Sequence, residues 1–179
     1  GLAEALLAGF EDRDNGGFYF THHDHQGLIH RPKPGYDNAT PSGNGVAAFA
    51  LQRLGHLLGE ARYLAAAGRA LALFYPQLQS QPAGFLSFLF ALEEALTPPR
   101  IVILRGQEGE VREWRRALAR DLLPDALILP LPNDLAALPP ALAKPPSEAV
   151  SAWVCQGPKC LAPIEDRAAL RQVCRAVPE

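Results

Sequence analysis

The feature that most constrains this 179-residue chain is a change in the spacing of its apolar residues at Pro98-Pro99. Residues 1–97 carry apolar side chains three and four positions apart, which is typical of amphipathic helices. Residues 100–179 contain short runs of consecutive apolar residues between helical stretches, which indicates strands. The sequence therefore predicts a helical-hairpin region over 1–97 and a small α/β module over 98–179.

Apolar stripes in the first region predict four helices. Thr40 is the expected N-cap of the second helix, Pro41 its first residue and Gly59 its stop signal. Pro76 is expected to end the third helix. The short connections favour antiparallel helical hairpins in a layered α/α arrangement. The expected helices cover residues 2–10, 41–58, 64–74 and 82–96.

A long irregular segment, residues 16–40, separates the first two helices. It is rich in Gly, Pro, His and Asp. Residues 18–20 and 28–29 are predicted to form two short strands of a hairpin with Gln26-Gly27 at the turn. Long loops in compact domains are uncommon and often functional, so we expect the site here.

The second region is predicted to begin with a parallel, right-handed strand–helix–strand unit. Residues 106–109 lack the spaced glycines and the lysine of phosphate-binding loops, so this unit is interpreted as a packing module. Asp166 is expected to cap a final helix that buries Leu170, Val173 and Val177. The other expected elements are strand 101–104, helix 111–122, strand 127–129, a short helix 135–143, and a hairpin of 149–154 with 161–164.

Charge and composition exclude several classes of function. The net charge is -2 and the sequence pI is about 6.2, so neither nucleic acid nor an anionic membrane is an expected partner. No apolar run approaches the roughly 18 residues that a membrane span needs. The chain has three cysteines and no signal-peptide pattern, which favours a cytoplasmic location. The chain contains no Met and begins at Gly1, which suggests a piece of a longer protein.

The polar segment, residues 37–44, is the leading candidate for a binding site. Asp37, Asn38, Ser42 and Asn44 lie just before an apolar helix, whose free N–H groups attract oxygen ligands. Amides, hydroxyls and carboxylates offer the alternating donors and acceptors that a sugar requires. The alternative is that these side chains only cap the helix and satisfy a turn.

Two cations upstream are further candidates for substrate binding. Arg31 and Lys33 share a face if 28–33 is extended, and can bind a carboxylate or phosphate, or pair with Asp37. The alternative is an ordinary solvated or ion-paired surface.

A cluster of histidines lies in the same irregular segment. His22, His23, Asp24 and His25 invite a metal interpretation, but their spacing matches no metal motif, so we predict neither a metal nor a cofactor. Because imidazole as a group changes charge near neutral pH, His25 and His30, with Asp37, are the candidates for acid–base catalysis.

The cysteines leave four interpretations open. Cys155 and Cys160 flank a predicted turn, and Cys174 lies on the last helix. Inert or slowly oxidising thiols are favoured, and the alternatives are a hairpin disulfide, a redox pair and half a zinc site. The four-residue spacer between Cys155 and Cys160 differs from the two-residue spacer of thioredoxin-type redox motifs.

Several motifs resemble the YyaL / spermatogenesis-associated protein 20 family of thioredoxin-domain proteins. The motifs are Gly17-Phe18-Tyr19, 28–33, 36–44, 99–103 and 153–160, which occur in order over most of the chain. The resemblance implies a mainly α fold, part of an (α/α)6-type, N-acylglucosamine 2-epimerase-like barrel of six hairpins, followed by the α/β module.

The resemblance also implies partners and two functions. An N-terminal thioredoxin-like domain and the remaining barrel helices would complete the parent protein, and the isolated piece would self-associate through exposed apolar faces. One implied function is a sugar epimerase- or glycosidase-like site at the barrel mouth. The other is a non-catalytic binding module that serves the thioredoxin-like domain.

Overall fold

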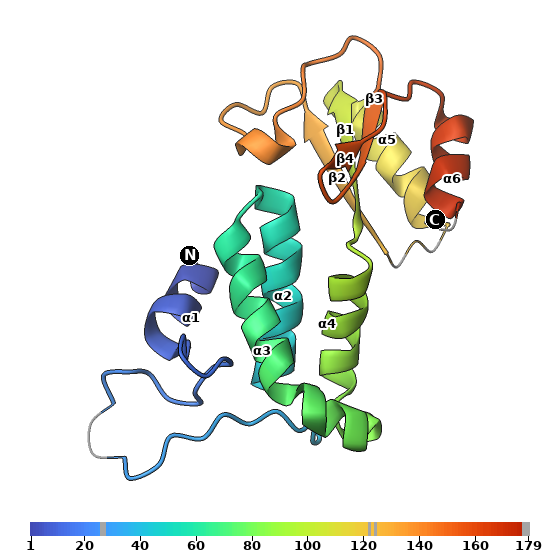
Figure 1. The fold of residues 1–179 in the computed structure, drawn as a ribbon. Helices are drawn as coiled ribbons and strands as arrows, with labels where there is room; N and C mark the ends of the chain where they lie inside the picture. Colours follow the sequence, from blue (N-terminus) through green and yellow to red (C-terminus); the bar gives the residue numbers. More distant parts are fainter. Residues whose placement is uncertain (26–27, 122, 124, 177–179) are drawn as a thin grey trace. The chain divides into compact units, whose positions relative to one another are not determined.

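The computed structural model describes residues 1–25, 28–121, 123 and 125–176. The chain forms two compact units, Gly1–Thr97 and Pro98–Glu179 (Figure 1). The first contains α1 (Leu2–Phe10), α2 (Gly43–Leu58), α3 (Ala61–Ser80), a 3-10 turn η1 (Pro82–Gly84) and α4 (Leu86–Leu96). The second contains β1 (Arg100–Gly106), α5 (Glu108–Ala119), β2 (Ala126–Pro132), the 3-10 turn η2 (Pro140–Leu142), β3 (Ser151–Gln156), β4 (Lys159–Cys160) and α6 (Arg167–Arg175).

The first unit is built around α2, which packs against both α3 and α4. Its core contains Leu51 and Phe74 from the stripes predicted by helical spacing, together with Phe88, which those stripes did not include. Two polar contacts add to this packing between α2 and α4. Gln52 donates a buried hydrogen bond to the Ala91 carbonyl at 2.7 Å, and Arg53 pairs with Glu94. The helix α2 is therefore fixed on two sides, and its N-terminus is held in a defined place.

The second unit is a mixed sheet with strand order β2-β1-β3-β4. Strand β1 pairs parallel with β2 and antiparallel with β3, and β2 carries Pro130 and Pro132. Alternate residues of β1 and β3 pack against buried side chains of α5 and α6 in one apolar cluster. That cluster contains Val102, Leu104, Val111, Leu118, Ala152, Val154, Leu170 and Cys174.

The predicted fold class is wrong. The described residues form six α-helices and a four-stranded mixed sheet, which is an α/β mixed fold and not a partial (α/α)6-type barrel with a small α/β part. An apolar stripe shows that one face of a helix is buried, but it does not show how many helices cover that face. The prediction that the helices close into a barrel rested only on the family resemblance.

Several local predictions are confirmed. The strand–helix–strand unit is parallel, as expected. Gly59 ends α2 in the left-handed conformation at φ 70°, and Asp166 caps α6 by accepting a hydrogen bond from the Ala169 N–H. Helix α6 buries Leu170, whereas Val177 lies outside the described residues.

Other local predictions are wrong. Helix α2 begins two residues later than expected, because Ser42 and not Thr40 supplies the capping oxygen. Helix α3 continues through Pro76. Within the described residues, 18–20 and 28–29 form no strand pair, the expected turn at 26–27 lies outside them, and 135–143 is reduced to η2. The hairpin predicted around residues 156–159 is present, but its second strand is β4. Residues 161–164 add a hydrogen bond from the Leu161 N–H to the Val154 carbonyl and a bridge between Ile164 and Ala152.

Among the described helices, none combines the length and the apolar character that crossing a bilayer requires.

Candidate functional site

The polar segment is held in place by Asn44, whose side chain is buried and fully bonded. Its Oδ1 accepts from the Phe18 N–H at 2.6 Å, and its Nδ2 donates to the Phe18 and Pro34 carbonyls at 2.9 and 3.0 Å. One amide therefore fastens both ends of the irregular segment to the first turn of α2. Asn44 is a structural residue, and its polar atoms are not free for a ligand.

Asp37 joins the polar segment to the start of α4. Its carboxylate accepts from the Ser42 N–H at 2.7 Å, the Ser87 N–H at 2.8 Å and the Ser87 hydroxyl at 2.6 Å. Ser42 Oγ also caps α2 by accepting from the Gly45 N–H at 3.0 Å. Asp37 and Ser42 thus satisfy the first turns of two helices at once.

The environment of Asp37 argues against its role as a general acid. Burial alone raises the pKa of Asp37, but the hydrogen bonds from Ser87 and Ser42 outweigh it, so the pKa lies below its ordinary value. A carboxylate with a lowered pKa stays ionised at neutral pH, and these three donors occupy its oxygens.

Asp12 is the centre of a second buried polar cluster. It accepts from the Tyr19 hydroxyl at 2.7 Å, from Lys33 Nζ at 2.9 Å and from the Asn15 N–H at 3.0 Å. Burial by itself raises the pKa of Asp12, but these donors lower it well below its usual range. The hydrogen bond to Asp12, followed by burial, raises the pKa of Tyr19.

Arg31 and Lys33 meet at one aromatic ring. The Arg31 guanidinium lies 3.9 Å and Lys33 Nζ 5.3 Å from the centroid of the Tyr19 ring. Lys33 pairs with Asp12, and not with Asp37 as one alternative had it. Arg31 donates to the Thr21 carbonyl at 2.6 Å and keeps part of its surface exposed.

Around the histidines, as elsewhere within the described residues, no group of three or more His, Cys, Asp or Glu side chains converges as potential metal ligands. His22 packs edge-on against Phe10, and His23 Nε2 lies 3.1 Å from the Glu11 carbonyl oxygen. His25 and His30 are exposed, and neither lines a described cavity.

A cavity of about 350 Å³, here called the aromatic cavity, lies beside the polar segment. The Phe20 side chain is 73% exposed there and the Tyr36 side chain 55% exposed. Asn38 and Thr40 are also exposed, and within the described residues their side-chain polar groups form no hydrogen bond. The remaining lining residues are Leu6, Phe18, Tyr19, Pro34, Pro41, Ser42, Gly43 and Asn44.

Two other hollows in this unit differ in character. A charged hollow of about 570 Å³ is lined by Glu11, Asp12, Tyr19, His23 and Arg31 among others. An apolar groove of about 580 Å³ between α2 and α4 is lined largely by apolar side chains, including the exposed Val46, Leu86 and Phe90. Self-association through such exposed apolar side chains stays a prediction.

The structure separates the residues that the sequence grouped together. Asn38, Ser42 and Asn44 line the aromatic cavity, and of these three Asn38 is the one whose side chain forms no hydrogen bond to the described residues. Arg31 lines the charged hollow, and the ammonium group of Lys33 forms an ion pair with Asp12. The sequence pattern did not indicate Asp12 or the exposed rings of Phe20 and Tyr36 as candidate site residues. The aromatic residues within the irregular segment were the available signal for the two rings.

No protein-family model matches the chain, and no curated protein matches it either. The resemblance to the YyaL / spermatogenesis-associated protein 20 family therefore stays a prediction.

The lowered pKa values of the partly or fully buried Asp12 and Asp37 predict a loss of stability in acid. A folded-state pKa below the unfolded value stabilises the fold above the unfolded pKa, and this contribution is lost as pH falls through the folded pKa. The contribution of these two carboxylates to the free energy of unfolding of residues 1–97 should be constant above about pH 5 and fall steadily below about pH 4. All four tyrosines lie in 1–97 and both tryptophans in 98–179, so near-ultraviolet tyrosine dichroism during urea titrations reports this unit.

Asp37→Ala should flatten part of that acid slope, because its carboxylate no longer titrates. Asp24→Ala, which removes an exposed carboxylate from the same irregular segment, is the control and should keep the wild-type slope. Identical slopes in all three proteins would contradict the assignment.

Proposed function

We propose that residues 1–97 bind a small carbohydrate-type ligand in the aromatic cavity and act as a binding module. The observation that carries this proposal is the pairing of exposed aromatic rings with side chains whose polar groups are unpaired in the described structure. A pyranose ring has apolar C–H faces that lie on aromatic rings and hydroxyls that need amide and hydroxyl partners. Phe20 and Tyr36 supply the rings, and Asn38 and Thr40 the polar groups.

The size of the cavity agrees with a small ligand. Its volume of about 350 Å³ is at the lower end of the range for small-molecule sites, roughly 300–1,000 Å³. Several lining residues, including Asn44, are fixed by internal hydrogen bonds, so this wall is preformed. Preformed walls reduce the entropy lost on binding.

A binding role is favoured over turnover. Catalysis on a sugar needs a positioned acid and base, and such pairs have pKa values pushed apart near the working pH. Asp37 is occupied by three donors, and His25 and His30 do not line the aromatic cavity. We therefore retain the non-catalytic alternative and propose the family relationship only as the resemblance implies it.

Ligand titrations test the proposal. Neutral monosaccharides and disaccharides are titrated against the full chain by calorimetry, with their phosphates as a second panel. Asn38→Ala should weaken binding of a neutral sugar about tenfold, as loss of a hydrogen bond in a partly dry site implies. Tyr36→Ala should weaken it at least as much.

The matched control is Tyr75→Ala, because Tyr75 is an exposed tyrosine on α3 that lines none of the described cavities. It should leave the dissociation constant unchanged. If the chain bound sugar phosphates but no neutral sugar, and if Arg31→Ala abolished this binding while Asn38→Ala left it unchanged, the binding site would be the charged hollow and not the aromatic cavity. No binding of any sugar at millimolar concentration would overturn the proposal.

A further inference from the structure

Cys155 and Cys160 form a disulfide across the β3–β4 hairpin, at one edge of the sheet. The two residues are register partners on β3 and β4, five positions apart in the sequence. Cys155 is 7% exposed, whereas Cys160 lies on the surface. The favoured expectation of free thiols at these positions is therefore wrong, and the hairpin-disulfide alternative is the one observed.

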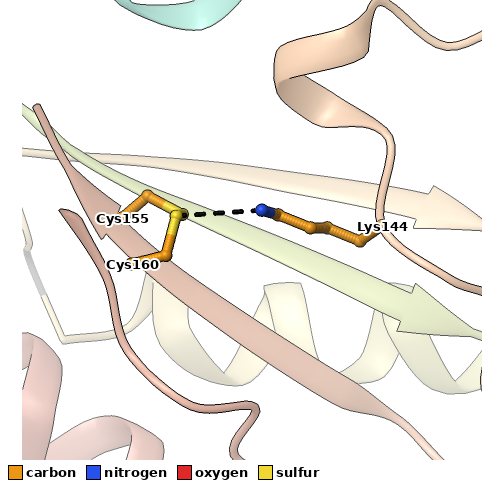
Figure 2. Close-up of a disulfide and its surroundings, with 3 residues drawn as sticks. All are labelled: Lys144, Cys155 and Cys160. Carbon is orange, nitrogen blue, oxygen red and sulfur yellow. Dashed lines mark hydrogen bonds between the residues drawn. A yellow bond between two sulfur atoms is a disulfide. The ribbon is translucent and has the colours of Figure 1, made fainter. Parts of the chain in front are cut away.

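A cation lies against this disulfide. Lys144, in the segment that follows η2, extends its side chain to the bridge, and its Nζ is 3.7 Å from Cys160 Sγ (Figure 2). Within the described residues, the Lys144 ammonium group makes no other polar contact. An ammonium group beside a sulfur atom favours the thiolate over the thiol. The contact falls on the sulfur of Cys160, the more exposed of the two residues, where we expect an incoming thiol to attack.

We propose that Cys155 and Cys160 are a redox-active pair that exchanges with a dithiol reductant, with Lys144 as the residue that activates Cys160. This goes beyond ligand binding by the first unit and does not depend on it.

The exchange balances in two steps. A thiolate of the reductant attacks Cys160 Sγ, the bond to Cys155 breaks, and its electron pair leaves on Cys155 Sγ, which takes a proton from solvent. The second thiolate of the reductant then attacks the reductant's own sulfur in the mixed disulfide and releases Cys160 as a thiolate beside Lys144. The protein pair gains two electrons, and the reductant dithiol becomes a disulfide.

Lys144 acts in both directions. It stabilises Cys160 as the leaving group during reduction, and it keeps Cys160 ionised as the nucleophile when the reduced pair attacks another disulfide. Cys174 differs from this pair, because it is fully buried in the apolar cluster and burial raises the pKa of its thiol. It serves as an unreactive internal reference.

The first experiment reduces the native full chain with dithiothreitol and, separately, with glutathione. Thiols are counted by alkylation and mass spectrometry without denaturant. Two thiols, at 155 and 160, should appear within minutes, while Cys174 reacts only after unfolding. A bridge that resists millimolar dithiothreitol until the protein is denatured, or cysteines that are already free in air-oxidised protein, would overturn the proposal.

The second experiment measures the role of Lys144 in the reduced protein. Lys144→Met should slow alkylation of Cys160 by iodoacetamide about three- to tenfold at pH 7. The difference between the two proteins should vanish near pH 10, where a cysteine thiol is ionised with or without a neighbouring cation. Lys144→Arg should keep most of the wild-type rate. Lys159→Met removes another exposed lysine next to Cys160 and should have little effect. Equal rates for the wild type and Lys144→Met at pH 7 would refute the assignment of Lys144.

Discussion

Asp37→Ala is expected to lower the free energy of unfolding of residues 1–97 by about 2–4 kcal/mol. The carboxylate accepts three hydrogen bonds from Ser42 and Ser87, which are both buried. Each net bond to a charged acceptor contributes about 1.5–3 kcal/mol, and the contributions of neighbouring bonds are not additive. Removal of the carboxylate leaves two backbone N–H groups without an acceptor at the starts of α2 and α4.

Urea unfolding followed by tyrosine dichroism measures this loss. Asn38→Ala is the matched control, because it truncates the next residue, whose side chain is exposed, and should change stability by no more than about 0.5 kcal/mol. Tryptophan fluorescence, which reports residues 98–179, should be unaffected. A stability change below about 0.5 kcal/mol for Asp37→Ala would show that Asp37 does not hold the two helices, and it would reopen its candidacy as a catalytic group.

Gly45→Ala is expected to destabilise the same unit by about 2–3 kcal/mol, although alanine favours helices. A Cβ at this position would lie 2.0 Å from Ser87 Oγ and 2.7 Å from Ser87 Cβ. The Ser87 side chain cannot simply rotate away, because its hydroxyl donates to Asp37 at 2.6 Å. The helices α2 and α4 must therefore separate or the hydrogen bond must break.

Gly43→Ala provides the matched control within the same helix. It lies two residues earlier in α2, and a Cβ there meets nothing within 4 Å. It should be neutral or stabilising by up to about 1 kcal/mol. If the two alanine variants had equal stability, the close approach of α2 to Ser87 would be wrong.

Elements with a strong periodic pattern could be predicted from the sequence, and elements set by context could not. The stripe of Leu51 and Leu54 places α2, and the apolar run at 101–104 places β1. By contrast, Pro76 did not end α3, because Leu78 beyond it is buried in the core and its packing offsets the missing hydrogen bond. The segment 135–143 has apolar residues in helical order, but Pro139 and Pro140 limit it to one 3-10 turn.

The location of the candidate site could be predicted, but the roles of its residues could not. The polar segment does lie at a cavity, and its amides and hydroxyls are the groups expected there. A sequence does not show which polar groups already form hydrogen bonds within the protein. Asn44 and Lys33 were therefore predicted to bind a ligand, whereas in the structure Asn44 is bonded to the Phe18 backbone and Lys33 to the Asp12 carboxylate. The cluster around Asp12 could not be predicted, because two of its partners, Tyr19 and Lys33, are 7 and 21 positions away.

The prolines of β2 bear on how this protein behaves at high concentration. In the described part of the sheet, β2 is an outermost strand, and Pro130 and Pro132 bring no N–H to it. A strand from another molecule that approached this border would find donors missing, so β-type polymerisation through it is disfavoured. Pro130 and Pro132 therefore reduce the tendency of the protein to aggregate through this edge.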